Sequence, residues 1–587
     1  MFNPHSSRDC ELRTLMSPCI WLGSDSANSA NSANSANSAS RSSLSIRSNR
    51  TPEIKSPLWF FLRILTVSSF AVLTSCSFAP IYSVPNVGES NTDKWRDDPW
   101  VEAKPSDATD KGQWWKLFND AYLDQLEETL EKGSPSLAIA LAKYDQATAY
   151  LKQAESQELP TVDASGSTTQ NRQSRNRPLR GSNQPDYYNA YTGMLTTNYE
   201  IDFWGRVRGL VASAKAQAQA SAGDLQTEKL SLQSKLAQIY FQLRGNDKQI
   251  AVLAESIKAY DRALVLIKNR YEAGIASGVD LARAQTQLST AKAEVSELSI
   301  QRALYEHAIA VLVGAPSQAF TVAPTYSVRA ELAAPFVNAA NYASKGAQNE
   351  RTESGRARDS SSISPEELAS YLKALQVVDP PQVPTALPST LLQRRPDVAA
   401  AERRAAAANQ RIGVAKAAFY PSFSIGASAG YQNTGGPAWM SEPNSVWSIG
   451  PAASFNLFDN GLRRAQLSIA KSALEQSGGE YRLVVLTAFQ QVEDAMVKLK
   501  EYKVETRDRA LAAFAADRAM RLSTSRYKDG AVNYLEVITA QTAALQAERS
   551  LITLDTSRLI TSIELIKALG GGWSKGSLGP DVSLRQD

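Results

Sequence analysis

The sequence repeats itself at an offset of 256 residues, without a gap. The matched positions are Gly205 with Gly461, Ala214-Lys215 with Ala470-Lys471, Arg270-Tyr271 with Arg526-Tyr527, Gly274 with Gly530, Ala284-Gln285 with Ala540-Gln541, and Gly314 with Gly570. A repeat unit this long is a whole substructure rather than one turn of a solenoid. The chain is therefore a tandem duplication, and its fold has to contain one substructure twice.

Each copy contains a long coiled-coil pattern. In the first copy, apolar residues recur at alternating steps of four and three with one polar interruption: Leu236, Ile239, Leu243, Asn246, Ile250, Leu253, Ile257, Tyr260, Leu264, Ile267 and Tyr271. Residues 205–271 contain no proline, so this helix can reach roughly 100 Å at 1.5 Å per residue. In the second copy the seam runs from Val485 to Leu499 and then becomes rich in alanine.

Both long helices are predicted to end at a bend and to return as a second helix. The two bends read Arg270-Tyr271-Glu272-Ala273-Gly274 and Arg526-Tyr527-Lys528-Asp529-Gly530. Glycine suits the left-handed residue that ends a helix. We expect new helices to begin near Asp280 and Glu536. Each copy is therefore predicted to form a helical hairpin with its tip at the glycine.

The segment before each long helix has a period of two, which is typical of a strand. After Pro421, the apolar residues Phe423, Ile425, Ala427, Ala429 and Tyr431 alternate with serine and glycine, and a return strand follows through Trp447, Ile449, Phe455 and Leu457. The first copy has a weaker strand after Pro160 and a return strand over residues 187–203. Alternation over about ten residues with aromatic ends fits a transmembrane barrel, whereas the edge of a soluble sandwich is the alternative.

Four strands per chain cannot close a barrel, because the smallest transmembrane barrels have about eight. Closure therefore requires self-association. A dimer would give eight strands around a filled interior, whereas a trimer would give twelve strands and an open lumen. Two helical hairpins per chain would make a tube of twelve helices in a trimer. The number of helices in the tube would then equal the number of strands in the barrel.

The start of the chain carries a targeting signal. Lys55 and Arg63 flank the short apolar run 64–72, which leads into Leu73-Thr74-Ser75-Cys76. Small residues before a cysteine are typical of a bacterial lipoprotein signal, which predicts cleavage and lipid attachment at Cys76. An ordinary secretory signal is the alternative. The preceding residues contain tandem Ser-Ala-Asn triplets and are predicted to be a disordered leader or an untranslated one.

Composition argues against several functional classes. The net charge of +4 shows no basic excess, so we expect no nucleic-acid partner. The only cysteines are Cys10, Cys19 and Cys76 and the only histidines are His5 and His307, so a chain that starts at Cys76 has no disulfide and no Cys/His metal site. No phosphate-binding loop motif is present. We therefore expect neither an enzyme nor a cofactor.

These features resemble the TolC-like outer membrane factors, most closely the lipoprotein branch that serves RND-type efflux pumps. The residues that carry the resemblance are the Leu73 to Cys76 lipobox, Trp114-Trp115-Lys116-Leu117-Phe118, Leu159-Pro160, residues 199–205, Leu391-Leu392-Gln393-Arg394-Arg395-Pro396-Asp397-Val398, Phe419-Tyr420-Pro421, and both Arg-Tyr-x-x-Gly tips. They span nearly all of the chain after Cys76.

The resemblance implies an α+β membrane protein that forms a homotrimer, with a twelve-stranded outer-membrane β-barrel continuous with a periplasmic α-helical barrel. It implies a lipid-anchored exit duct for drugs or other small molecules, working with a periplasmic adaptor and an inner-membrane RND transporter. The outer-membrane component of a type I protein secretion system is a related alternative. A trimeric coiled-coil surface stalk is an alternative from a different class.

The resemblance also implies a domain organisation. The expected parts are a leader (1–53), a signal peptide (54–75), a lipid-anchored segment with the first efflux repeat (76–314), an equatorial connection (315–395), the second efflux repeat (396–570) and a tail (571–587). The equatorial connection is longer than is usual in the family, and its polar stretch 338–364 is predicted to be a surface insertion.

Site residues are implied at the hairpin tips. Adaptor docking is expected at the two tips, through Arg270, Tyr271, Gly274, Arg526, Tyr527 and Gly530. A periplasmic gate is expected just beyond the second tip, with Leu535, Glu536, Thr539 and Asp280 as candidates. Related lipoproteins place charged residues where Thr539 and Thr542 stand, so the usual charged gate is not preserved. For Asp280 and Glu536 the alternative role is charge complementing a helix dipole.

Overall fold

The structure of the chain is a computed structural model that describes residues 78–85, 111–174, 176, 185–324, 365–381, 395–435 and 438–571. All of these residues belong to one compact unit, Phe70–Asp587. Several predicted features lie outside the described residues: the leader and signal peptide, the lipid-attachment candidate Cys76, the insertion 338–364 and all but the first residue of the tail.

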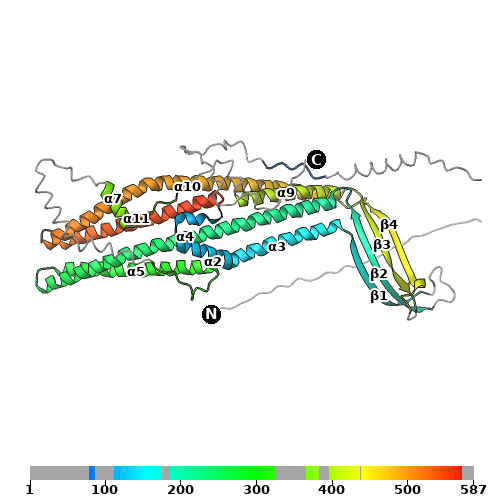
Figure 1. Ribbon diagram of the computed structural model, residues 1–587, viewed down its shortest axis with the longest axis horizontal. Helices are drawn as coiled ribbons and strands as arrows, with labels where there is room; N and C mark the ends of the chain where they lie inside the picture. Colours follow the sequence, from blue (N-terminus) through cyan, green and yellow to red (C-terminus); the bar gives the residue numbers. More distant parts are fainter. Residues whose placement is uncertain are drawn as a thin grey trace, which may run out of the picture. The chain divides into compact units, whose positions relative to one another are not determined.

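Two helical hairpins dominate the fold (Figure 1). The first is α4 (Arg206–Glu272) with α5 (Gly278–Val313), and the second is α10 (Leu462–Lys528) with α11 (Tyr534–Ala568). The two long helices have 67 residues each and begin 256 residues apart, as the repeat predicts. Glycines with positive φ stand at matched helix ends, at Gly205 and Gly461 and at Gly314 and Gly570. The duplication is therefore confirmed in three dimensions.

Shorter elements precede and connect the hairpins. Those before the first hairpin are η2 (Lys111–Phe118), α2 (Ala121–Gly133), α3 (Pro135–Glu155) and η3 (Ser156–Glu158), and those between the hairpins include α7 (Pro365–Ala374), α9 (Pro396–Ala417) and η5 (Glu442–Asn444). Alanines on α9 let it lie close to α4 and α10. A Cβ added at Gly223 of α4 would stand 3.0 Å from the Ala400 methyl, so glycine permits this approach.

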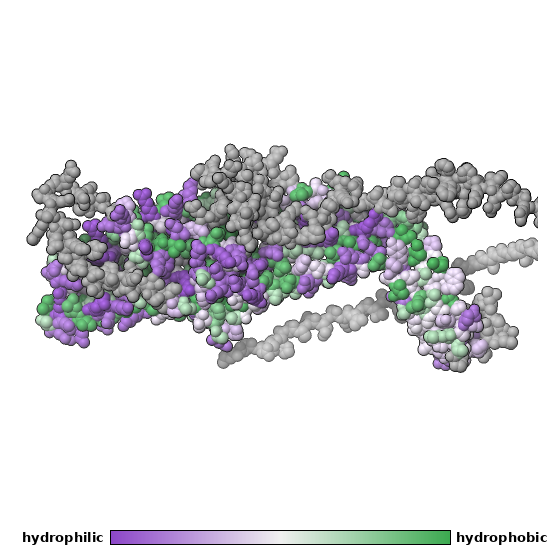
Figure 2. Space-filling view, in the orientation of Figure 1, coloured by the Kyte–Doolittle hydropathy of each residue, from purple (hydrophilic) through white to green (hydrophobic). Residues whose placement is uncertain are grey.

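The four strands form one antiparallel sheet in the order β1-β2-β3-β4, with β1 Thr161–Arg172, β2 Tyr187–Ile201, β3 Ser422–Asn433 and β4 Ser445–Ser454. Its register separates two faces. Ile425 lies opposite Tyr199 and Pro451, and other apolar residues share this face. Ser428 lies opposite Thr196 and Ser448 on the polar face. Figure 2 shows strongly hydrophilic side chains along the helices and few over the strands.

Three sequence expectations fail at element ends. The first return strand was expected over residues 187–203, but β2 ends at Ile201. Phe455 and Leu457 were expected on the last strand, but β4 ends at Ser454 opposite Ser422, the first residue of β3, so no partner remains for them. Tyr271 was expected in the buried seam but is 47% exposed, because α4 ends one residue later. The rest of that seam is buried or half-buried.

The largest core joins the first hairpin to α2 and the preceding turn. Trp115, Leu123, Tyr240 and Leu243 are almost completely buried there. Each such side chain stabilises the fold by roughly 1.5–3 kcal/mol through the apolar surface it removes from water. A search of the described helices finds none with an apolar stretch sufficient to cross a membrane.

Candidate functional site

The tips of the two hairpins contact each other within one chain. The Arg270 guanidinium lies 4.9 Å from the centre of the Tyr527 ring, and the Tyr527 and Tyr534 ring centres are 5.4 Å apart. Behind them, Ile267 of α4 packs with Tyr534 and Val537 of α11 in a buried cluster. A cation over a tyrosine face is attracted by the ring quadrupole. The tip is therefore held by an apolar cluster capped with a cation–π contact.

The Tyr534 hydroxyl is buried in this cluster and has no hydrogen-bond partner among the described residues. Burial, followed by the nearby Tyr527, raises the pKa of Tyr534 to about 12. The ring therefore stays neutral at physiological pH and acts as an apolar contact.

The predicted gate residues Asp280 and Glu536 occupy matched positions in the first turn of α5 and α11. Ser277 Oγ accepts from the Asp280 amide at 3.1 Å and donates to the Asp280 carboxylate at 2.8 Å. Asn533 Oδ1 accepts from the Glu536 amide at 3.1 Å. These contacts fit the helix-capping role that the sequence left open. The exposed Glu536 carboxylate also accepts from Ser523 Oγ at 3.4 Å.

The predicted gate residue Leu535 is 44% exposed and lines a groove of about 670 Å³ between α5 and α11. Ile538 and Thr542 follow it along α11, while Arg283 and Glu294 stand on the α5 side. Thr539 is exposed and donates its hydroxyl to the Leu535 carbonyl at 2.9 Å, which satisfies the hydroxyl within its own helix.

The predicted docking residues differ in exposure: Arg270 and Tyr527 contact each other between the hairpins, whereas the other four are exposed at the tips. Gly274 and Gly530 adopt φ of +71° and +75°, and a Cβ added at either would meet no atom within 4 Å. Arg526 is exposed, as is Tyr271. Glycine is required here by the left-handed backbone rather than by crowding. The tips are therefore open to a partner.

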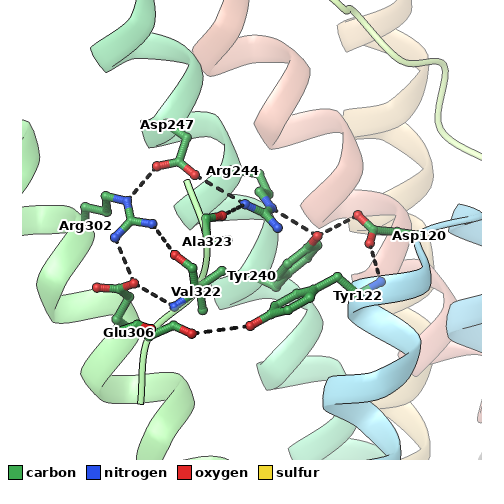
Figure 3. Close-up of polar contacts among 10 residues, drawn as sticks. Asp120, Tyr122, Tyr240, Arg244, Asp247, Arg302, Glu306, Val322 and Ala323 are labelled. Atoms are coloured by element: carbon green, nitrogen blue, oxygen red, sulfur yellow. Dashed lines mark hydrogen bonds and ion pairs between the residues drawn. The ribbon is translucent and has the colours of Figure 1, made fainter. Parts of the chain in front are cut away.

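A buried ion network, absent from the sequence predictions, holds the first hairpin to its flanking segments (Figure 3). The fully buried Asp247 carboxylate accepts from Arg302 at 2.7 Å and from Arg244 at 3.4 Å. Arg302 also contacts Glu306 and the Val322 carbonyl, and Arg244 contacts the Ala323 carbonyl.

The same network reaches α2. Arg244 Nε donates to the Tyr240 hydroxyl at 3.0 Å, and that hydroxyl donates to Asp120 at 2.6 Å. Asp120 in turn accepts from the amides of the first turn of α2. Charged residues inside a coiled-coil seam are the only sequence signal that could have identified this network.

The segment after α7, residues 376–379, is held by the next turn of α4 and by α11. Lys248 Nζ donates to Asp555 of α11 at 3.0 Å and to the Gln376 carbonyl at 2.8 Å. Asp555 also accepts from the Val378 amide, and Arg558 pairs with Asp379 at 2.9 Å. Burial raises the pKa of Asp555, and the Lys248 charge opposes that shift. The connection after α5 is thus anchored on both hairpins.

The Arg-Pro-Asp-Val motif has a structural role. Arg395 donates to both carboxylate oxygens of Asp397, to Gln491 and to the Ala568 carbonyl at 2.9 Å. The motif therefore joins the start of α9 to the end of α11. Arg394, its other arginine, lies outside the described residues.

The segment 78–85 lies against the junction of helices and strands. Phe78 stacks on Tyr420 with ring centres 4.6 Å apart and lies 6.0 Å from Trp204. Asn409 of α9 donates to the Pro80 carbonyl at 2.7 Å. An aromatic group thus stands where the sheet meets the helices, two residues after Cys76.

The geometry points to a class of protein: a sheet with one apolar face, joined to helical hairpins that end in open tips, is the arrangement of an outer-membrane channel. In the described residues, no group of three or more His, Cys, Asp or Glu side chains is placed to hold a metal ion. The family model for outer membrane efflux proteins matches residues 126–315 and 387–571, and the chain belongs to this family.

Similar proteins agree with this assignment. The chain is 26% identical over 508 residues to the outer membrane protein OprJ of Pseudomonas aeruginosa, covering 86% of this chain and 94% of OprJ. It is 27% identical over 512 residues to the toluene efflux pump outer membrane protein TtgC of Pseudomonas putida, covering 87% and 95%. The CmeC outer membrane channel of Campylobacter jejuni shares the fold, with a TM-score of 0.69 at 21% identity over 85% of this chain and 96% of CmeC.

These findings confirm the predicted family, the TolC-like α+β fold, the outer-membrane location and the role in efflux. The roles of the individual tip and gate residues stay predictions, as do the domain boundaries.

Proposed function

We propose that the chain is the trimeric exit duct of a tripartite RND-type pump, which carries drugs or other small molecules across the outer membrane as a passive, gated channel. The observation that carries the proposal is the sheet, whose four strands have one apolar and one polar face. Among the described residues, no further strand pairs with its edge strands β1 and β4. Lipid cannot satisfy the backbone groups of an open edge, so the sheet has to close with other copies.

Exposed apolar stripes on the helices support the trimer. On α10, Ile469, Leu483, Val497 and Val504 are exposed and are spaced by multiples of seven residues. On α5, Ile300, Leu304 and Val311 are exposed at steps of four and seven. A heptad stripe buries itself against another helix. In a trimer, the hairpins supply twelve helices to one tube, and the sheets supply twelve strands to one barrel.

The gate is proposed at the first turn of α11. Leu535 supplies an apolar ring in the trimer and Glu536 an acidic one, with Asp280 as its repeat counterpart and Thr539 one turn further on. Three carboxylates that face a pore repel one another, which favours a gate that opens readily. The exposure of Leu535 and Glu536 supports this assignment.

The partners of the duct are proposed from its two ends. The exposed tips, with Arg270, Tyr271, Gly274 and their repeat counterparts, dock a periplasmic adaptor that joins the duct to an inner-membrane RND transporter. At the other end, lipid attached to Cys76 anchors the chain. The stacking of Phe78 on Tyr420 supports the anchor, because aromatic side chains favour the membrane interface. The name of the relative TtgC, a toluene efflux pump protein, supports small apolar substrates.

Conductance of the purified protein in lipid bilayers tests the proposal. We expect a small resting conductance that falls in Glu536→Gln, because neutralising the carboxylates removes the mutual repulsion that favours opening. The matched control is Glu475→Gln, which changes an exposed glutamate of α10 far from the tip. Unchanged conductance in Glu536→Gln would place the gate elsewhere, and no conductance in any variant would favour a surface stalk.

A further inference from the structure

The contact between the two hairpins of one chain has a repeat-related counterpart that one chain cannot make. The helices lie in the order α5, α4, α11, α10, so α4 and α11 form the contact between hairpins (Figure 1). In the repeat, α10 is the counterpart of α4 and α5 is the counterpart of α11. The counterpart of the α4–α11 contact therefore joins α10 of one chain to α5 of the next copy in the ring. On these faces lie the exposed apolar residues Val504 of α10 and Ile300 of α5, whose repeat counterparts Lys248 and Thr556 lie in the contact between α4 and α11.

Most polar contacts between the hairpins do not survive this shift. Within the chain, Lys248 pairs with Asp555, Gln249 with Thr553, Gln287 with Gln541, and Glu294 with Arg549. The corresponding pairs between copies are Val504 with Ser299, Glu505 with Glu297, Ala543 with Gln285, and Ser550 with Ala293. None of these pairs unites opposite charges, and one unites two acidic side chains.

The cation–π contact at the tip does survive. Arg270 and Tyr527 of one chain become Arg526 and the Tyr271 of the following copy. Both groups are free to form it: among the described residues, no aromatic ring lies beneath the Arg526 guanidinium and no cation lies over Tyr271. Tyr271 packs one edge near Gly278 and leaves 47% of its surface exposed.

We propose that, in the closed assembly, the guanidinium of Arg526 lies over the ring of Tyr271 of the partner subunit, so that one Arg–Tyr contact recurs at all six hairpin boundaries of the ring. The inference rests on the trimer of the proposed function and adds the polar contact that joins its subunits at the tip. The contact between subunits is also the weaker of the two kinds, because Ser523 stands where Ile267 packs behind the contact within the chain.

Site-directed cross-linking tests this contact in the full-length trimer. The variant Arg526→Cys with Tyr271→Cys is treated with a short bismaleimide, since side chains this long separate the two backbones too far for a disulfide. The matched control is Arg270→Cys with Tyr527→Cys, whose residues meet within one chain and calibrate the linker length. Each single cysteine variant controls for the native cysteines.

We expect covalent dimers and trimers on a denaturing gel for the first pair, and a chain of monomer mass with an internal link for the control pair. In bilayers, Arg526→Ala and Tyr271→Ala should each raise the resting conductance roughly two- to tenfold, with no further rise when combined, because both remove one contact. Arg526→Lys should retain part of the effect of arginine.

The outcomes separate the two proposals. Native mass measurement that finds no trimer refutes the proposed assembly and this contact together. An intact, conducting trimer that gives no intersubunit product, with a linker that closes the control pair, overturns the contact and leaves the proposed duct standing. Additive effects of the two alanine substitutions on conductance also count against the contact.

Discussion

A buried glutamate in α2 gives the sharpest test of the energetics. Glu127 is completely buried, and neither carboxylate oxygen has a hydrogen-bond partner among the described residues. It lies on the face of α2 that carries Leu123 and Leu130, and the partly buried Asp124 adds a repulsive charge. Burial, followed by Glu131 and Asp124, raises the pKa of Glu127 well above its usual range. Burying this carboxyl group without a hydrogen bond destabilises the folded state.

Replacing Glu127 with methionine should stabilise α2. Methionine has a similar volume and helix propensity and needs no hydrogen bond. An unsatisfied buried polar group costs about 1–3 kcal/mol, so the free energy of opening α2 should rise by about that amount. Hydrogen exchange through local opening should then slow by roughly 5- to 150-fold at pH 7. The measurement is mass-spectrometric hydrogen exchange of α2 peptides in the detergent-solubilised protein.

The pH dependence follows from the raised pKa. The open state of α2 releases the Glu127 proton near the ordinary glutamate value of about 4.3, whereas the folded state keeps it to higher pH. Stability contributed by this group is therefore fully present below about pH 4.3 and is lost as pH rises towards the raised pKa, by up to about 1.4 kcal/mol per pH unit. The advantage of Glu127→Gln over the wild type should accordingly grow from pH 5 to pH 7.

The exposed neighbour Glu128 provides the control, because Glu128→Met changes the same residue type on the same helix without removing a buried carboxyl group. Exchange in α2 should be nearly unchanged in that variant. Faster or equal exchange in Glu127→Met would show that Glu127 has a partner or that its carboxyl group reaches water, and would refute the reasoning.

Two further predictions concern the contacts that hold the hairpins. Asp247→Asn should destabilise the protein by about 3–5 kcal/mol, because it removes the shared charge between Arg244 and Arg302, and its melting temperature should fall while that of Asp261→Asn, an exposed site on α4, does not. A Cβ at Gly245 would clash with Thr556 Oγ1, so Gly245→Ala should cost about 1–3 kcal/mol. Adding Thr556→Ala should recover part of the loss in melting temperature, and no recovery would mean that the strain lies elsewhere.

Much of the architecture is readable from the sequence because its signals are local and periodic. The steps of four and three in the first copy, the glycines at both tips and the alternation after Pro421 each follow from the geometry of one helix, one turn or one strand. Element ends were less predictable. Phe455 continues the alternation of β4 but has no partner strand, and pairing depends on residues far away in the sequence.

The candidate site was only partly predictable. The sequence located the tips and the first turn of α11. It did not indicate that Arg270 reaches Tyr527, whereas Arg526 lies over no aromatic ring in the part of the chain that the structure describes. It also singled out Asn246 as a polar interruption without identifying the neighbouring Asp247 as the centre of an ion network. Such contacts join residues 55 to 257 positions apart, so no local pattern records them.

The sequence by itself determined that one unit occurs twice, that each unit pairs strands with a helical hairpin, and that a single chain cannot close its own barrel. These conclusions rest on periodicity and on the number of strands, which are properties of the chain alone. The tertiary structure decided which helices become neighbours, and therefore which of two identical Arg-Tyr pairs finds its partner within the chain. The physical reason is that duplication preserves residue types, whereas contact depends on which copy lies beside which.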